Sequence, residues 1–233
     1  MLHINPTGLI RLGKNNKERY SNLNIILSCI QKNGGNIAVP TYSYTYTKKK
    51  IYNVKDTPSD LDGVSEFLRV NNKDKRTADA NFSYLLFGNE FSNRYFSISD
   101  YSSFGENSLI DEVFKKDGYL GAIGGALEYL TEIHYLERKL NIPYRFDKIF
   151  KGSSIDVNGK LVNNQVTYYC RDLTSSYSVS FVQLKVDIRL EGLVKIWKLE
   201  EYNLKIEVVK IRELYAFIKE KLSIDPEYLW KKV

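Results

Sequence analysis

Histidine and cysteine are scarce in this chain of 233 residues. There are two histidines, His3 and His134, and two cysteines, Cys29 and Cys170. Zinc sites in proteins draw most of their ligands from these two residue types, so no metal site is expected. The cysteines lie far apart in the sequence, which favours two lone thiols over a disulfide framework.

Long apolar stretches are also absent. No run of about 18 apolar residues is present, so no membrane-spanning helix is expected. The first residues do not combine a charged segment with a following apolar segment, as a secretory signal does. Together with the lone thiols, these absences predict a cytoplasmic protein with no membrane partner.

Positive charge is in excess, with a net charge of +6 and a pI of about 9.0. Such a balance suits polyanions or small phosphorylated ligands. The tight lysine cluster at Lys48–Lys50 follows Tyr42, Tyr44 and Tyr46, and aromatic rings next to cations can stack on bases. A tyrosine-rich strand end is the favoured interpretation, because no nucleic-acid-binding motif is present. No nucleic acid partner is expected.

The order of the expected elements predicts the fold class. A helix over 17–31 precedes a strand over 36–40, and further buried strands are expected over 82–88 and 119–123. A helix is expected from Ala126 to Asn141. We therefore predict an α/β protein, with three α/β/α layers around a central, mostly parallel sheet.

From about residue 150 the pattern changes to short extended runs and a helical stripe, which predicts an α+β elaboration over about 150–233. No linker or internal repeat separates it from the rest, so a single domain over 1–233 is expected. The glycines before the expected helix, Gly121, Gly124 and Gly125, do not have the spacing of a dinucleotide fingerprint.

The interior histidine lies within a local pattern. Thr131, His134 and Glu137 are three residues apart, so each would neighbour the next on a helix. A carboxylate one turn from an imidazole can fix the tautomer of the imidazole and raise its basicity. An ordinary surface pair has the same spacing, and from the spacing alone it is the commoner arrangement.

Polar residues also stand at strand ends. Thr41, Tyr42 and Ser43 follow the expected strand over 36–40, and open α/β sheets bind ligands at that end of their strands. Asp79 precedes the strand over 82–88 and is either a turn residue or a positioned carboxylate; the turn is favoured.

Several segments, taken in order, resemble the aminoglycoside 3-N-acetyltransferase family, also called antibiotic N-acetyltransferases. The match that is closest to the family pattern is Thr131, His134 and Glu137 followed by Pro143-Tyr144-Arg145 and Lys148. The other resembling segments are His3 with Gly8 to Gly13; Val39 to Ser43; Asp56 to Ser59 with Gly63, Glu66 and Arg69; Ser103 to Ser108; and Asp225 to Leu229.

Two departures from the family pattern bear on the ligands. Ile4 and Asn5 stand where the family has two serines, in the part that holds the phosphates of the cofactor. Asp79-Ala80 stands where the drug-modifying members have His-Pro, and this form resembles a branch associated with surface-polysaccharide amino sugars.

The resemblance implies an acetyl-CoA-dependent N-acetyltransferase that needs no metal. The acceptor it implies is an amino sugar, nucleotide-linked and destined for a surface polysaccharide, whose amine attacks the donor directly. The partners are then this small molecule and coenzyme A, and a homodimer is a further expectation. The implied site residues are His134, Glu137 and Asp79 for catalysis; His3, Ile4, Asn5, Thr41 and Ser43 for the cofactor; and Tyr42, Asp79 and Thr131 for the substrate.

In this interpretation His134 is the general base, Glu137 orients it, and Asp79 receives the ammonium of the substrate. The oxyanion donors are left open between backbone N–H groups of the Asn5 loop and the hydroxyls of Thr41 and Ser43. Two other functions are kept as alternatives: acetylation of an aminoglycoside antibiotic, and a catalytically impaired family member that acts as a binding protein.

Overall fold

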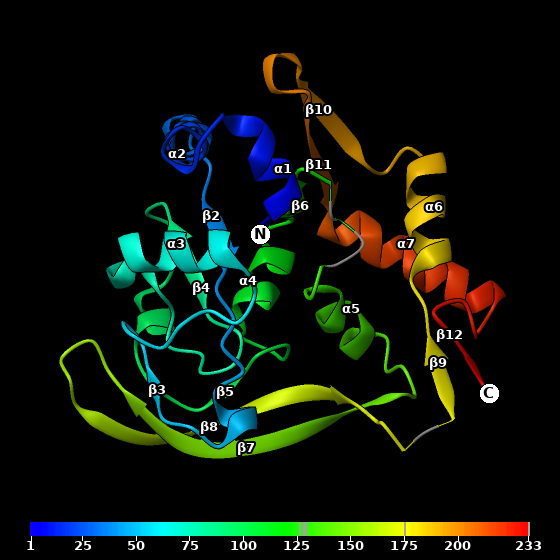
Figure 1. Cartoon of the computed structure of the whole chain (residues 1–233). Helices are drawn as coiled ribbons and strands as arrows, with labels where there is room; N and C mark the ends of the chain where they lie inside the picture. Colours follow the sequence, from blue (N-terminus) through cyan, green and yellow to red (C-terminus); the bar gives the residue numbers. More distant parts are fainter. Residues whose placement is uncertain (126, 128–129, 175, 233) are drawn as a thin grey trace.

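A computed structural model describes the chain over residues 1–233 except 126, 128–129, 175 and 233 (Figure 1). The helices are α1 (Pro6–Leu9), α2 (Asn16–Lys32), α3 (Gly63–Asn71), α4 (Leu109–Lys115), α5 (Ile133–Lys139), α6 (Val182–Leu190) and α7 (Ile211–Ile224). The strands are β1 (Leu2–Ile4), β2 (Ile37–Pro40), β3 (Tyr52–Asn53), β4 (Tyr84–Phe87), β5 (Tyr101–Ser102), β6 (Tyr119–Ile123), β7 (Arg145–Ile155), β8 (Leu161–Arg171), β9 (Tyr177–Val179), β10 (Lys195–Leu199), β11 (Leu204–Lys210) and β12 (Trp230–Lys232).

The central strands are buried on both faces, and alternate residues enter different cores. Val39 of β2 and Ile123 of β6 pack with side chains from α1, α2 and α3. Their neighbours Ala38 and Ala122 pack with side chains from α4, α5, α6 and α7. Successive strand residues point to opposite faces, so these two clusters lie on the two sides of the layer of strands, which consists of the sheet β1-β6-β11-β10 and the separate pair β2-β4. The predicted α/β class, with helices on both sides of the strands, is confirmed.

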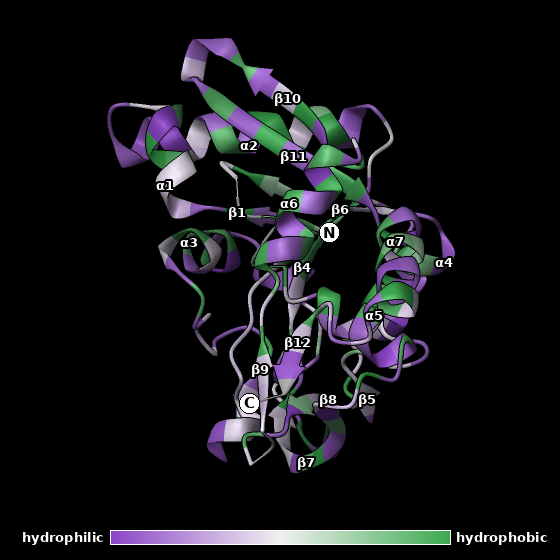
Figure 2. Ribbon diagram, turned by 90° about the vertical axis from the view of Figure 1, so that its right-hand side faces the viewer, coloured by the Kyte–Doolittle hydropathy of each residue, from purple (hydrophilic) through white to green (hydrophobic). Residues whose placement is uncertain are grey.

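The direction of the strands differs in part from the prediction. β1 pairs with β6 in parallel, but β6 with β11, β11 with β10, and β2 with β4 are antiparallel. The expectation of a mostly parallel central sheet is therefore corrected to a mixed one. β10 and β11 are joined by a short connection, and strands joined in this way run antiparallel. Figure 2 shows hydrophobic and hydrophilic residues alternating along β11, whose Leu204 and Val209 are buried in different clusters on its two faces.

A long hairpin made of β7 and β8 runs beneath the other elements in Figure 1. β7 also pairs with β3, and β8 with β5, both in parallel. This sheet therefore combines strands from both sides of residue 150, where the C-terminal elaboration was predicted to begin. The elements that follow, α6 and α7, lie beside α5 (Figure 1).

The helix that holds His134 is shorter than predicted. α5 begins at Ile133, with Glu132 as the residue before its first turn, and not at Ala126. Part of the predicted helix, residues 126 and 128–129, lies outside the described residues. β6 ends at Ile123 and is followed by Gly124 and Gly125, which have φ values of +88° and +75°. Residues other than glycine rarely adopt such angles, so the chain turns at this point and does not continue directly into a helix.

Candidate active site

His134 and Glu137 lie on the first turns of α5 and contact each other. His134 Nδ1 is 2.5 Å from Glu137 Oε2. The carboxylate side chain is fully buried, while 16% of the histidine side chain is exposed. The predicted spacing thus gives a short contact between a buried carboxylate and a partly accessible imidazole, as a base with an orienting partner requires.

The other ring nitrogen of His134 faces a cation. Arg145 Nη2, at the start of β7, lies 3.2 Å from His134 Nε2. A guanidinium has donors only, so Nε2 must be the accepting nitrogen. Nδ1 then carries the hydrogen and donates it to Glu137. In this tautomer the lone pair is on Nε2, on the side of the ring away from the carboxylate.

Glu137 is held from three directions. Besides His134, it receives the Tyr144 hydroxyl on Oε1 at 2.5 Å, and Arg145 Nε lies 2.9 Å from Oε2. Burial, followed by the charge of Glu137, raises the pKa of Tyr144 well above its usual range, so the phenol keeps the proton that it donates. Because the side chain of Arg145 is only 7% exposed, this ion pair is shielded from water.

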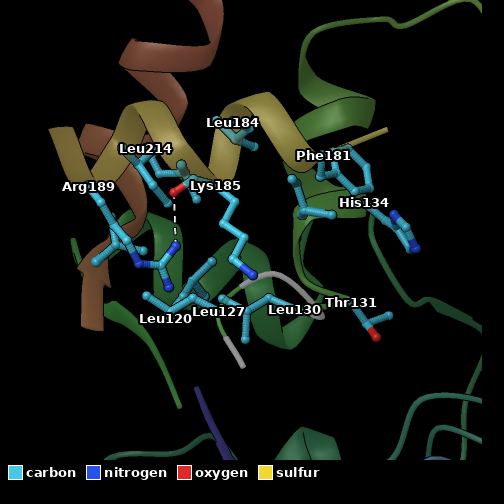
Figure 3. Close-up of a pocket in the computed structure, with 13 residues that line it drawn as sticks. Leu120, Leu127, Leu130, Thr131, His134, Phe181, Leu184, Lys185, Arg189 and Leu214 are labelled. Carbon is cyan, nitrogen blue, oxygen red and sulfur yellow. Dashed lines mark hydrogen bonds between the residues drawn. The ribbon is translucent and has the colours of Figure 1, made fainter. Parts of the chain in front are cut away.

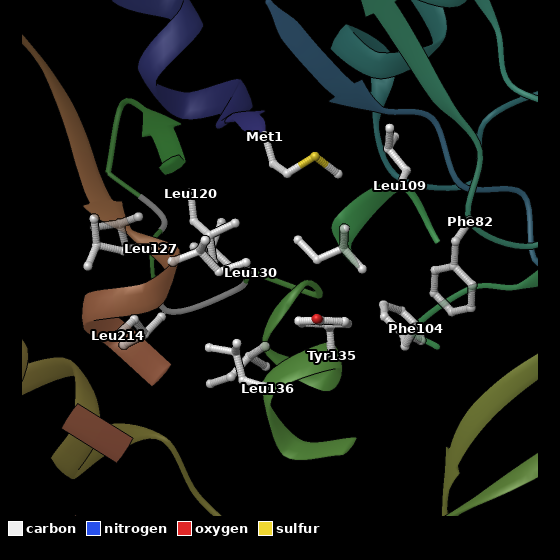
Figure 4. Close-up of a cluster of buried hydrophobic side chains, with 14 of the residues drawn as sticks. Met1, Phe82, Phe104, Leu109, Leu120, Leu127, Leu130, Tyr135, Leu136 and Leu214 are labelled. Atoms are coloured by element: carbon white, nitrogen blue, oxygen red, sulfur yellow. The ribbon is translucent and has the colours of Figure 1, made fainter. Parts of the chain in front are cut away.

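Aromatic side chains form one wall next to His134. The Phe104 ring meets the imidazole edge to face, with centroids 5.5 Å apart. Phe82 packs against Phe104, with ring centroids 4.7 Å apart (Figure 4). It also packs against Tyr168, with centroids 4.7 Å apart. The Tyr44 ring extends the wall, with its centroid 5.3 Å from that of Phe82. The backbone of Tyr44 has a φ of +48°. A rigid wall of this kind limits the directions from which an acceptor can reach the base.

A cavity of about 270 Å³ opens on another side of His134 (Figure 3). It lies between α5, α6, α7 and the strands β6 and β11. Its lining includes His134 and Thr131, the cations Lys185 and Arg189, and nine apolar side chains: Leu120, Leu127, Leu130, Ile133, Phe181, Leu184, Ile188, Val209 and Leu214.

A second buried polar group surrounds Glu132, immediately before α5. His3 Nε2 lies 2.9 and 2.8 Å from the two oxygens of this carboxylate. The hydroxyls of Tyr42 and Tyr84 lie 2.9 and 3.1 Å from its Oε1. Burial opposes ionisation of Glu132, but the charge of His3 and its hydrogen bond lower the pKa of Glu132 to about 2.

This group contains two of the predicted ligand-binding residues. His3, expected at the cofactor, and Tyr42, expected at the substrate, are both hydrogen-bonded to Glu132. Alternation along β1 explains the position of His3: it points toward the α5 side, whereas Ile4 is buried in the cluster beneath α1 and α2.

The remaining predicted cofactor residues form local structural contacts. Asn5 accepts from the backbone N–H of Thr7 at the start of α1, and its Nδ2 donates to the Gly125 carbonyl. The backbone N–H of Asn5 donates to the Ile123 carbonyl. Thr41 and Ser43 are buried, and their hydroxyls donate to the Ser83 and Ala80 carbonyls. None of these hydrogen bonds involves the imidazole of His134.

Asp79 has both carboxylate oxygens occupied. Oδ1 accepts from the backbone N–H groups of Asn81 and Phe82, and Oδ2 accepts from the Ser103 hydroxyl. Burial raises the pKa of Asp79, and these donors offset part of that shift. This is the turn arrangement that the sequence favoured over a positioned carboxylate.

The structure therefore brings His134, Glu137 and Thr131 together, the last through its carbonyl, which accepts from the His134 N–H, and as part of the cavity lining. It also adds residues to which the sequence reasoning gave no role: Glu132, Tyr144 and Arg145. The last two stand within the segment that resembles the family. Glu132 carried no signal, because on the expected helix it would lie two residues from the base and off its face.

None of the helices that the described residues form is both long and apolar enough to cross a membrane. Within the same described part of the chain, no three His, Cys, Asp or Glu side chains are grouped as metal ligands would be.

Comparison with known proteins gives a family and a fold. The family model described as aminoglycoside 3-N-acetyltransferase matches residues 23–223. A search of curated protein sequences gives no match. The match to the family model covers most of the chain, and the chain belongs to the aminoglycoside 3-N-acetyltransferase family. It is thus an N-acetyltransferase, and acetyl-CoA is the co-substrate of this family.

Solved structures share the fold at low sequence identity. AAC-IIIb, in a binary complex with coenzyme A, has a TM-score of 0.69 at 15% identity, over 96% of this chain and 89% of that chain. The YokD protein from Bacillus subtilis has a TM-score of 0.69 at 16% identity, over 97% and 88%. AAC-VIa bound to sisomicin has a TM-score of 0.69 at 14% identity, over 96% and 91%.

Proposed function

We propose that the chain transfers an acetyl group from acetyl-CoA to the primary amine of an amino sugar, with His134 Nε2 as the general base. The observation that carries this proposal is the arrangement of the imidazole. Its Nδ1 is held by the buried carboxylate of Glu137, which leaves the lone pair on Nε2. Arg145 Nη2 lies 3.2 Å from Nε2, and the amine of the acceptor takes its place at the lone pair in this proposal.

The amine nitrogen forms a bond to the thioester carbonyl carbon, and the carbon–sulfur bond breaks. His134 takes the proton that the amine loses and returns it to the departing sulfur, so the products are the amide and coenzyme A. Glu137 stabilises the imidazolium between these two transfers. Because Arg145 lies beside Nε2, a protonated amine meets a like charge there, and the site favours the neutral amine.

We assign Arg145, rather than the Asn5 loop, Thr41 or Ser43, as the charge that stabilises the oxyanion. The hydroxyls of Thr41 and Ser43 and the N–H of Asn5 donate within the protein. The Arg145 guanidinium is a buried cation at 3.2 Å from the base, where a preorganised charge acts on the reacting atoms without reorganisation.

The acceptor we propose is a nucleotide-linked amino sugar of the kind used for surface polysaccharides. The net charge of +6 favours an acceptor that carries phosphates over a polycationic one. Asp79 is not given a contact with the substrate in this proposal, because both of its oxygens accept hydrogen bonds within the protein. The cytoplasmic location and the homodimer predicted from the sequence belong to the same proposal. Sedimentation velocity measures whether the chain forms a homodimer.

An aminoglycoside is the second candidate acceptor, and the family itself favours it. The structure of AAC-VIa, which shares the fold, was determined with sisomicin bound. A catalytically impaired binding protein is the third candidate, and Ile4 and Asn5 in place of the two serines favour it.

Release of coenzyme A separates the three. The purified chain is incubated with acetyl-CoA and either nucleotide-linked amino sugars or aminoglycosides, and free thiol is measured with mass spectrometry of the product. We expect turnover with the sugar nucleotides and at least tenfold lower kcat/KM with aminoglycosides. Faster turnover with an aminoglycoside establishes the second candidate, and no turnover together with no calorimetric binding of coenzyme A establishes the third.

A further inference from the structure

The cavity beside His134 is larger than an acetyl group requires. A methyl group is close in size to a water molecule, whose share of liquid volume is about 30 Å³. The cavity has a volume of about 270 Å³. An acetyl group whose carbonyl carbon is close to His134 would therefore leave most of this space unfilled.

The lining of the cavity is mainly apolar, and its four polar residues are Thr131, His134, Lys185 and Arg189. Side chains of Leu120, Leu130, Leu184 and Val209 are all at most 6% exposed, and they present only carbon atoms. The pantetheine arm of coenzyme A has two amides and a sugar has several hydroxyls. Such groups cost free energy when they are buried without hydrogen-bond partners, so the apolar part of this lining fits neither of them.

The position of the polar residues gives the cavity a direction. In Figure 3, His134 and Thr131 lie on one side of it and Leu120 and Leu214 on the other. A thioester with its carbonyl carbon at the imidazole can direct its acyl tail along the leucines. The Arg189 guanidinium, on the α6 side of the cavity, makes an ion pair with Glu207, with Nη2 2.5 Å from Oε2, so Glu207 balances the charge of Arg189.

We infer that this cavity, lined mainly by leucine, isoleucine, valine and phenylalanine, is an acyl pocket, and that the preferred donors are coenzyme A thioesters of aliphatic acids with about four to eight carbons. The inference rests on the proposed function, because it concerns the acyl group that the same base helps to transfer. Acetyl-CoA remains a donor at the same site, with a lower kcat/KM than the longer thioesters. The bonds formed and broken are those of acetyl transfer, and the longer tail changes only the binding of the donor.

The test is the dependence of kcat/KM on acyl length, measured with acetyl-, propionyl-, butyryl-, hexanoyl-, octanoyl- and succinyl-CoA and one acceptor amine. Each methylene moved from water into the cavity is worth about 0.8 kcal/mol, a factor of about four. Hexanoyl-CoA is therefore expected to exceed acetyl-CoA by on the order of 10²-fold. A steady fall from acetyl-CoA with length overturns the acyl pocket and leaves the proposed function intact, and a maximum at succinyl-CoA overturns its aliphatic character.

Loss of turnover with every thioester counts against the proposed function, and binding then tests the pocket. In that case calorimetry compares hexanoyl-CoA with coenzyme A. A tenfold or greater gain in affinity from the acyl chain supports the pocket, and equal affinities overturn it.

A filled cavity gives a second test. Leu184 is 4% exposed and lines the cavity, whereas Leu190, on the same helix, is 80% exposed and is not among the lining residues. Leu184→Trp is expected to lower the ratio of kcat/KM for hexanoyl-CoA over acetyl-CoA at least tenfold, and Leu190→Trp to leave that ratio unchanged. The ratio does not depend on the fraction of folded protein, and Ile188→Phe is a milder filling variant. An unchanged ratio in both filling variants overturns the inference.

Discussion

Replacing Glu137 by glutamine removes one charge from the candidate site with little change in shape. Three donors face this side chain: His134 Nδ1 at 2.5 Å, Tyr144 Oη at 2.5 Å and Arg145 Nε at 2.9 Å. The carboxylate accepts hydrogen bonds from His134 and Tyr144 and makes an ion pair with Arg145, but a glutamine has one amide group that can only donate. At least one donor must therefore face an N–H group in Glu137→Gln.

The expected loss of rate follows from the charge on the imidazole. Two unit charges about 4 Å apart interact by about 4 kcal/mol at an effective dielectric constant of about 20. This stabilisation of the imidazolium is absent in Glu137→Gln, so kcat is expected to fall by a factor of about 10³. The KM for the amine should change much less, because Glu137 does not touch the acceptor in the proposed mechanism.

The assay is continuous release of the coenzyme A thiol, together with a thermal unfolding curve for each variant. Glu220→Gln, at an exposed position on α7, controls for the loss of one negative charge. The reasoning is refuted if folded Glu137→Gln keeps kcat within tenfold of the unmodified chain. A variant that does not fold is replaced by Glu137→Asp, which keeps the charge and should keep more activity than any folded neutral variant.

Three further predictions concern the surroundings of this pair. Arg145→Lys keeps a charge but not the forked guanidinium that reaches both the imidazole and the carboxylate, so its kcat should fall by about 10². The kcat of Arg145→Met should fall further, and equal activity of the two variants contradicts a role for the charge. The pKa of Glu132 is lowered from 4.5 to about 2, which corresponds to about 3 kcal/mol of stability. This stability is present above pH 4.5 and lost as the pH falls toward 2. The free energy of unfolding of Glu132→Gln, measured with denaturant, should therefore differ from that of the unmodified chain more at pH 6 than at pH 3, and a constant difference contradicts the shift. A Cβ atom on Gly8 would lie 2.4 Å from the Gly124 Cα, so Gly8→Ala should lose about 1–3 kcal/mol in the same unfolding assay, whereas Gly63→Ala, with nothing within 4 Å, should not lose stability.

The His134–Glu137 contact could be predicted because it is local. Residues three apart on a helix are neighbours whatever the rest of the fold does. The helix existed where the sequence placed this pair, although it began later than expected. The expected strands over 36–40, 82–88 and 119–123 correspond to β2, β4 and β6 for the same reason, since short buried runs between turn signals carry their own pattern.

The partners of this pair depend on contacts that no local pattern encodes. Tyr144 and Arg145 reach Glu137 because the chain reverses after α5 and enters β7. His3 reaches Glu132 across 129 positions of sequence, through the pairing of β1 with β6. The direction of the strands was missed on the same grounds, because β11 and β10 join the sheet from the far end of the chain.

Steady-state acetyl transfer by His134→Ala tests the central claim most directly. Coenzyme A release and the N-acetylated product are measured with the acceptor that the unmodified chain uses best, and circular dichroism checks the fold of the variant. The account predicts a loss of kcat/KM of at least about 10³, because no other residue among those described beside the cavity can accept the proton. Folded His134→Ala with kcat/KM within tenfold of the unmodified chain would contradict the assignment of the base.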